Sequence, residues 1–68
     1  MIKINGDYIT LGQFLKLTSI ISFGGEAKMF LATHQVFVND EEDNRRGRKL
    51  YPNDVVTCLN KKYQIYKK

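Results

Sequence analysis

The greatest concentration of charge in this 68-residue chain lies at positions 39–49, where the sequence reads NDEEDNRRGRK. Four acidic residues at positions 40–43 are followed by four basic ones, which are Arg45, Arg46, Arg48 and Lys49. A block of one sign indicates a partner of the other sign, because a merely solvated loop gains nothing from sorting its charges. Lysine and arginine side chains can both contact phosphates, and arginine can also stack on unpaired bases. The acidic block either faces away from such a partner or holds the arginines apart in the free protein.

Length and composition limit what the chain can do. A domain of this size buries only about 60% of its unfolded surface, which leaves little room for a deep catalytic cleft. Its composition is that of a globular domain, 43% hydrophobic and 26% charged, with a net charge of +4 that favours a polyanion or anionic lipid. No apolar run approaches the roughly 20 residues of a membrane helix, and the first residues lack a secretory pattern. We therefore expect a cytoplasmic protein that does not contact a membrane.

The residues most often used in catalysis are scarce, with one histidine, His34, and one cysteine, Cys58. They cannot supply the four nitrogen or sulfur ligands of a structural zinc site, and no phosphate-binding loop, dinucleotide-binding motif or nucleophile elbow is present. Cys58 lies in a strand-like stretch that predicts a buried thiol, and His34 is expected to cap a helix end. We expect no enzymatic activity, no metal, no cofactor and no small-molecule substrate.

A first helix is predicted in TLGQFLKLTSII, residues 10–21, where apolar side chains recur at helical spacing. Thr10 and Gln13 have the spacing of a capping box, in which each side chain bonds to the backbone amide of the other. The helix should therefore begin at Thr10, with Gln13 and Lys16 on its polar face.

A second, short helix is predicted in SFGGEAKMFLAT, residues 22–33. Its buried stripe is formed by Ala27, Phe30 and Leu31, and Lys28 lies outside the stripe. Two glycines, Gly24 and Gly25, precede the first turn. They either make the helix start flexible or present backbone amides to a phosphate.

Other segments alternate with a period of two and predict strands, at residues 1–5, 35–39, 55–59 and 62–68. The first and last of these could pair as neighbours. Pro52 and Asn53 are suited to a turn before the third strand, and the acidic run should be an exposed turn because it is too charged for a sheet interior. The order predicts an α+β fold, with two short helices packed on a small antiparallel or mixed sheet of three to five strands.

Residues 9–56 resemble the RNA-binding domain named after small-subunit ribosomal protein S-four, also called the alpha-L motif. The resemblance rests on GGEAK at 24–28, HQVFVND at 34–40 and PNDVV at 52–56, with the family's spacing between them. The stretches LGQFLKL, GGEAK and RRGRKLYP further resemble the stand-alone bacterial members of the YaaA and YbcJ type. The resemblance implies the alpha-L fold and a single RNA-binding domain over residues 1–68, with its core motif at about 9–56.

Three departures from the family pattern affect the backbone. His34, Asp40 and Asn53 occupy positions where the family usually has glycine at positive φ. Asp, Asn and His are the non-glycine residues most often found there, so the backbone path is expected to survive all three changes.

In this family the two helices and the loop that follows them form the nucleic-acid face. Transferring only the polar positions of that face gives eight candidate RNA-binding residues, namely Gln13, Lys16, Gly25 (through its amide), Lys28, Arg45, Arg46, Arg48 and Lys49. The resemblance implies a monomer that recognises structured RNA, in the first place ribosomal RNA or the ribosome, by shape and phosphate contacts. Its role would lie in ribosome assembly or translation.

Other interpretations remain open. A basic strand edge can protect a sheet from aggregation without binding anything. The charge blocks can also dock a ribosomal or RNA-processing protein, so that the chain acts as an adaptor. DNA is disfavoured because neither helix has a row of base-reading side chains. Tyr51, Tyr63 and Tyr66 could stack on bases, but tyrosines of small sheets usually cover the core, so they are not among the candidates.

Overall fold

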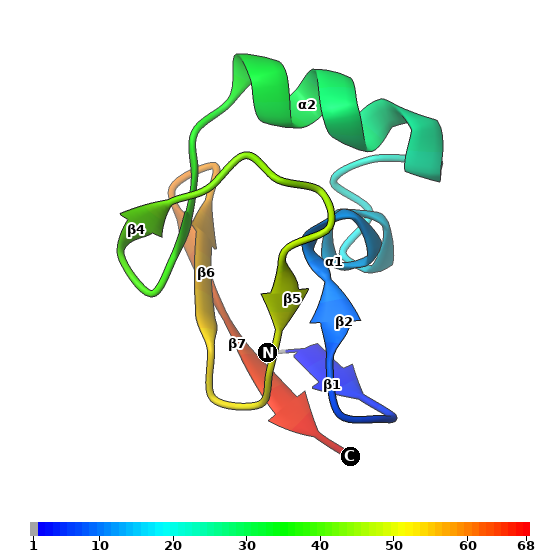
Figure 1. The fold of residues 1–68 in the computed structure, drawn as a ribbon, viewed down its shortest axis with the longest axis vertical. Helices are drawn as coiled ribbons and strands as arrows, with labels where there is room; N and C mark the ends of the chain where they lie inside the picture. The colour runs from blue at the N-terminus through cyan, green and yellow to red at the C-terminus, as the bar shows by residue number, and fades with distance from the viewer. Residues whose placement is uncertain (1) are drawn as a thin grey trace.

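The structure, a computed structural model that describes residues 2–68, places two helices over one face of a mixed sheet (Figure 1). The elements in chain order are β1 (Ile2–Ile4), β2 (Ile9–Thr10), α1 (Leu11–Leu17), the 3-10 turn η1 (Gly24–Glu26), α2 (Ala27–Thr33), β3 (Val36–Val38), β4 (Glu41–Glu42), β5 (Lys49–Leu50), β6 (Val55–Cys58) and β7 (Lys61–Lys67). This is the α+β arrangement that the sequence predicts. Within the described residues, no helix has both the length and the apolar character needed to span a membrane.

The main sheet has the order β1-β7-β6-β3-β4, and a separate two-stranded sheet joins β2 to β5. β1 runs parallel to β7, with Ile2 opposite Ile65, so the two ends of the chain do pair as their patterns indicated. The other neighbours are antiparallel. In the small sheet Ile9 is opposite Leu50 and Thr10 is opposite Lys49.

The core lies between the helices and the inner face of the sheet. Its buried side chains come from every layer and are Ile4, Leu11, Phe14, Leu15, Ile21, Ala27, Leu31, Val36, Val38, Leu50, Val56, Cys58 and Ile65. The buried stripes of both predicted helices and the inward residues of the predicted strands are confirmed, with Phe30 half-buried at the margin.

Helix α1 begins where the capping box predicts. The Gln13 amide donates to Thr10 Oγ1 at 3.2 Å, and the Thr10 amide donates to Gln13 Oε1 at 2.8 Å. These bonds satisfy amides that have no partner inside the helix. At the other end the Thr18 hydroxyl donates to the Phe14 carbonyl at 2.9 Å.

Two of the three glycine replacements adopt positive φ, and one does not. Asp40 has a φ of 69° and Asn53 a φ of 79°. His34 has a φ of −130°, so the expectation of positive φ at this position is wrong. Its imidazole stacks on the Phe30 ring with centroids 4.3 Å apart, and its backbone amide donates to the Phe30 carbonyl at 2.9 Å. These contacts complete the helix end with an extended backbone.

The acidic run is not merely an exposed turn, and that prediction needs correction. Glu41 and Glu42 form the edge strand β4, which a charged pair tolerates because only its backbone joins the sheet while its side chains remain in water. Asp43, which follows, is 8% exposed and donates its amide to the Val36 carbonyl at 2.9 Å.

Candidate nucleic-acid interface

Residues 44–48, which follow Asp43 and lead from β4 into β5, are termed the basic loop. In Figure 1 it passes beneath α2 and reaches the start of α1. The Leu11 amide donates to the Arg48 carbonyl at 2.8 Å, and the Gly12 amide donates to the Arg46 carbonyl at 2.9 Å. The first amides of a helix have no partner within it, so the loop backbone caps α1. This contact fixes the basic loop beside the polar face of the helix.

Gly12 is the point where α1, α2 and the basic loop meet. A Cβ atom built on Gly12 would lie 3.4 Å from the Arg46 carbonyl oxygen and 3.7 Å from the Cβ of Ala27. These distances are ordinary van der Waals contacts, so the backbones of the three elements approach one another closely here. The elements that carry Gln13, Lys28 and the arginines are consequently packed together, as a common surface requires.

Asp43 holds two arginines of the basic loop. Arg45 donates through Nε and Nη2 to the two carboxylate oxygens at 3.1 and 2.8 Å, and through its amide at 2.9 Å. Arg48 donates through Nη1 to Oδ2 at 2.8 Å. The side-chain hydrogen bond from Arg45, followed by its amide bond and the Arg48 bond, lowers the pKa of Asp43 far below its ordinary value despite the opposing effect of burial. The acidic block is thus divided, because Glu41 and Glu42 lie in water while Asp43 organises the loop.

The arginine side chains retain N–H groups that do not bond to Asp43 and can donate to a ligand. A guanidinium carries five N–H groups, and Asp43 contacts neither Nη1 of Arg45 nor Nε and Nη2 of Arg48. The Arg45 side chain is 70% exposed and that of Arg48 28%. Arg46 is exposed and makes no side-chain hydrogen bond or ion pair within residues 2–68. Lys49, on β5, places Nζ 5.0 Å from the ring centroid of Tyr8.

The helix candidates differ in their surroundings. Gln13 and Lys16 are exposed and line one open hollow of about 500 Å³ with Ile9 and Leu17. Lys28 is exposed on α2. All three are accessible to a large ligand.

Gly25 is exposed in η1, but its neighbours disfavour an anion. The Glu26 carboxylate accepts hydrogen bonds from the Ser22 amide at 2.9 Å and the Phe23 amide at 3.3 Å. It thereby brings a negative charge to this turn, so the phosphate contact at Gly25 stays a prediction without geometric support.

Sequence analysis left Tyr51 out of the candidates as a tyrosine expected to cover the core, and it did not single out Tyr8. Tyr8 and Tyr51 are 44% and 47% exposed, and their ring centroids lie 5.8 Å apart. Tyr63, in contrast, packs edge-on against Phe14 at 5.3 Å, as a core tyrosine should. The available signal was alternation, because Tyr8 and Tyr51 adjoin the inward Ile9 and Leu50.

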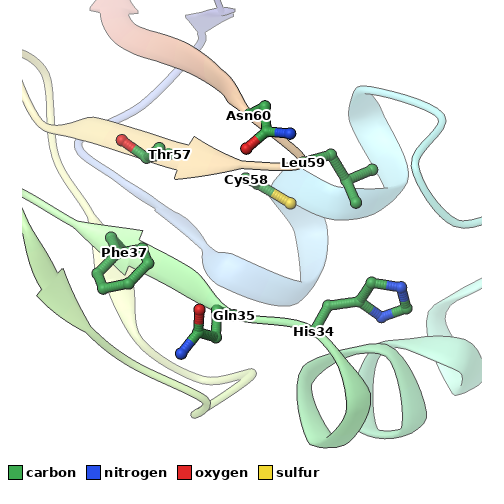
Figure 2. A pocket seen from close by; sticks show the side chains of 7 residues that line it. All are labelled: His34, Gln35, Phe37, Thr57, Cys58, Leu59 and Asn60. Carbon is green, nitrogen blue, oxygen red and sulfur yellow. The ribbon is translucent and has the colours of Figure 1, made fainter.

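A different hollow, of about 230 Å³, lies between the end of α2 and strands β3 and β6, where His34 and Cys58 both contribute to the lining (Figure 2). Burial raises the pKa of the Cys58 thiol, which disfavours the reactive thiolate. The Nδ1 atom of His34 lies 2.9 Å from Thr33 Oγ1 and 3.2 Å from the Phe30 carbonyl oxygen. This arrangement is that of a helix cap and a structural thiol. Over residues 2–68, acidic, histidine and cysteine side chains form no group of three suited to a metal ion.

Comparison with known proteins identifies the family to which this chain belongs. Residues 2–66 match the model of the S4 domain family, and the chain is a member of that family. It is also 66% identical over 55 residues to the probable ribosome maturation protein RlbA of Bacillus subtilis (strain 168). That alignment covers 81% of this chain and 78% of the relative. The family resemblance found in the motifs is therefore confirmed.

Proposed function

We propose that this chain is a non-catalytic protein that binds structured ribosomal RNA during ribosome maturation in the cytoplasm. The observation that carries the proposal is the attachment of the basic loop to the start of α1 through the Arg46 and Arg48 carbonyls. It holds the backbone of the basic loop against the start of α1, the helix that carries the exposed Gln13 and Lys16. Membership of the S4 family and the name of the B. subtilis relative support the same conclusion.

The chemistry of the surface suits RNA recognised by shape. Cations held on a fixed backbone can match the spacing of phosphates, and arginine forks can bond two phosphate oxygens at once. Glu41 and Glu42, exposed on β4, would repel a polyanion and limit how far it extends along the sheet. We propose that a single domain, acting as a monomer, makes these contacts.

Fluorescence anisotropy tests the proposal directly. The protein is titrated into a labelled ribosomal RNA hairpin, a DNA duplex of matched sequence and a single strand, each at several salt concentrations. With four to six phosphate contacts, the logarithm of the affinity should fall with the logarithm of the salt concentration at a slope of roughly −3 to −5, and the RNA hairpin should bind most tightly. Weak binding that does not distinguish the three nucleic acids would contradict the proposal.

Charge-matched variants locate the surface. Arg46→Gln should weaken binding and reduce the salt slope by about one, because one phosphate contact is lost. Lys62→Gln is the control. Lys62 neighbours the inward Tyr63 on β7 and therefore lies on the sheet face opposite α1. Equal losses in the two variants would mean that only net charge matters and that no specific surface exists.

A second candidate function is docking to a protein partner. Three large apolar side chains are exposed on the helical side of the molecule, and these are Leu17, Phe23 and Met29. Exposed apolar groups of this size suit a protein interface. Nuclease treatment distinguishes the two functions, because association with ribosomes should be lost only if RNA holds the chain there.

A further inference from the structure

The outer face of the small β2–β5 sheet carries an aromatic pair beside the arginines. Side chains alternate along a strand, so Ile9 and Leu50 face the core while Tyr8 and Tyr51, one residue beyond the pair, face the opposite side. Both rings are nearly half exposed, and they meet at an interplanar angle of 49°. The pair is therefore a surface feature that the packing of the core does not explain.

The two rings have different surroundings. The Lys49 ammonium lies over the Tyr8 ring, 5.0 Å from its centroid, so one face of Tyr8 is already occupied by a cation. No cation is placed over the Tyr51 ring within residues 2–68. Tyr8 thus supports both Lys49 and Tyr51, and Tyr51 is the ring available for stacking.

The backbone at Tyr51 is held firmly. Its amide donates to Asp54 Oδ2 at 2.8 Å, and its carbonyl accepts from the Asp54 amide at 3.0 Å across a turn in which Asn53 has positive φ. The Asn53 amide in turn donates to the Ile65 carbonyl of β7 at 2.8 Å. The backbone that carries this ring therefore loses little freedom when a ligand stacks on it.

Tyr51 also forms the edge of a basic hollow. This open space of about 400 Å³ is lined by Arg45, Gly47, Arg48, Lys49 and Tyr51. Its volume is in the range of small-ligand sites, and a Cβ on Gly47 would meet no atom within 4 Å. Cationic donors and an aromatic edge are the groups that recognise, respectively, the phosphate and the base of one nucleotide.

We propose that Tyr51 stacks on a single unpaired base of the bound RNA, with the phosphate of that nucleotide held in the hollow by Arg45, Arg48 and Lys49. This inference rests on the proposed RNA-binding function and specifies the ligand, an RNA helix interrupted by an unpaired nucleotide. A base inside a regular helix is stacked on its neighbours and presents no free face, so a fully paired RNA should leave Tyr51 unused.

The test compares two RNA hairpins that are identical except for one bulged 2-aminopurine nucleotide. Wild-type protein should bind the bulged hairpin about tenfold more tightly, and stacking should quench the 2-aminopurine fluorescence. Tyr51→Leu should abolish the quenching and the tenfold preference while binding the paired hairpin as before. Tyr51→Phe should retain both properties, because the stacking face is kept.

Tyr66→Leu is the matched control. Tyr66 is opposite Lys3 in the ladder and alternates with the inward Ile65, so it lies on the far face of the main sheet. It should leave the preference unchanged. The inference is overturned if wild-type protein binds both hairpins equally with a steep salt dependence, or if Tyr51→Leu keeps the preference. Wild-type protein that binds neither hairpin would instead overturn the proposed function, and the stacking site with it.

Discussion

At the scale of single residues, Asp43 explains why four acids adjoin four bases. Its carboxylate accepts hydrogen bonds from Arg45 and Arg48, and its own burial is compensated by those two charges. Simultaneous replacement of all three arginines is therefore a poor test of RNA binding, because it would leave Asp43 buried without a partner. Arg46, which has no role in this cluster, is the informative position.

Asp43→Asn separates geometry from net charge. The variant is more positive by one unit, so charge alone predicts tighter RNA binding. We expect weaker binding instead, together with a loss of about 1–3 kcal/mol in the free energy of unfolding, because the charged hydrogen bonds that shape the basic loop are lost. Glu42→Gln makes the same charge change at an exposed position and should bind RNA slightly more tightly. Anisotropy and urea unfolding of both variants check this, and tighter binding by Asp43→Asn would refute the role of the cluster.

The same carboxylate makes stability depend on pH. The pKa of Asp43 is lowered in the folded state, mainly by the Arg45 hydrogen bond, from about 3.9 in an unfolded chain. Its contribution is therefore complete above the unfolded value and is lost as the pH falls towards the folded value. The difference in unfolding free energy between wild type and Asp43→Asn should be constant from pH 6 to 8. It should shrink by about 1 kcal/mol at pH 3, as measured by urea unfolding at each pH, and an unchanged difference would contradict the assignment.

At the scale of elements, the start of α1 serves two purposes. The capping box satisfies the Thr10 and Gln13 amides, and the basic loop satisfies those of Leu11 and Gly12. The Leu11 and Gly12 hydrogen bonds that complete the start of the helix are therefore the same ones that position the basic loop. The α2 helix completes the arrangement through Ala27, which lies against Gly12.

Gln13→Glu tests whether this helix end faces RNA. A glutamate can accept the same hydrogen bond from the Thr10 amide and suits the first turn of a helix, so stability should be retained. The new negative charge should nevertheless weaken RNA binding several-fold, because it would lie beside phosphates. Gln13→Ala is the complementary control and should lower stability by about 1 kcal/mol with a smaller effect on binding. If Gln13→Glu bound RNA like the wild type, this end of α1 would lie outside the interface.

At the scale of the whole molecule, the last strand holds the fold together. β7 lies between β1 and β6, and its Ile65 is fully buried opposite Ile2. A domain of this size has a total stability of only about 3–10 kcal/mol. The interface therefore depends on a sheet in which the neighbouring strands β1 and β7 come from opposite ends of the chain.

Ile65→Ala should cost about 2–5 kcal/mol, because it removes buried methyl groups and leaves a cavity. Much of the protein should then be unfolded near 37 °C. Lys62→Ala, on the outer face of the same strand, should cost less than about 0.5 kcal/mol. Thermal unfolding followed by circular dichroism compares the two, and similar melting temperatures would mean that β7 is not essential to the core.

Much of the fold could be predicted because it depends on interactions between residues close in sequence. The capping box joins positions three apart, the buried stripes follow the helical period, and Asn53 supplies the positive φ that its turn requires. The family motifs then led to the prediction that Gln13, Lys16, Lys28 and the basic run lie on one face. These signals are local, and a single sequence records them directly.

Other features were decided by tertiary structure, because they depend on which surfaces meet. The charge pattern could not show that Asp43 is buried and holds Arg45 and Arg48, since that requires the loop path set by α1. The tyrosine positions were also undecided by the sequence. Tyr63 packs on Phe14 of α1, whereas Tyr51 remains at the surface, because β7 belongs to the main sheet under the helices and β5 to the small sheet. Sequence alone determined the two helices, the strands β1, β3, β6 and β7, and the class of protein, whereas the short strands β2, β4 and β5 emerged only in the folded chain. Packing decided which arginine is unengaged and which tyrosine can stack, because both depend on groups brought together only when the chain has folded.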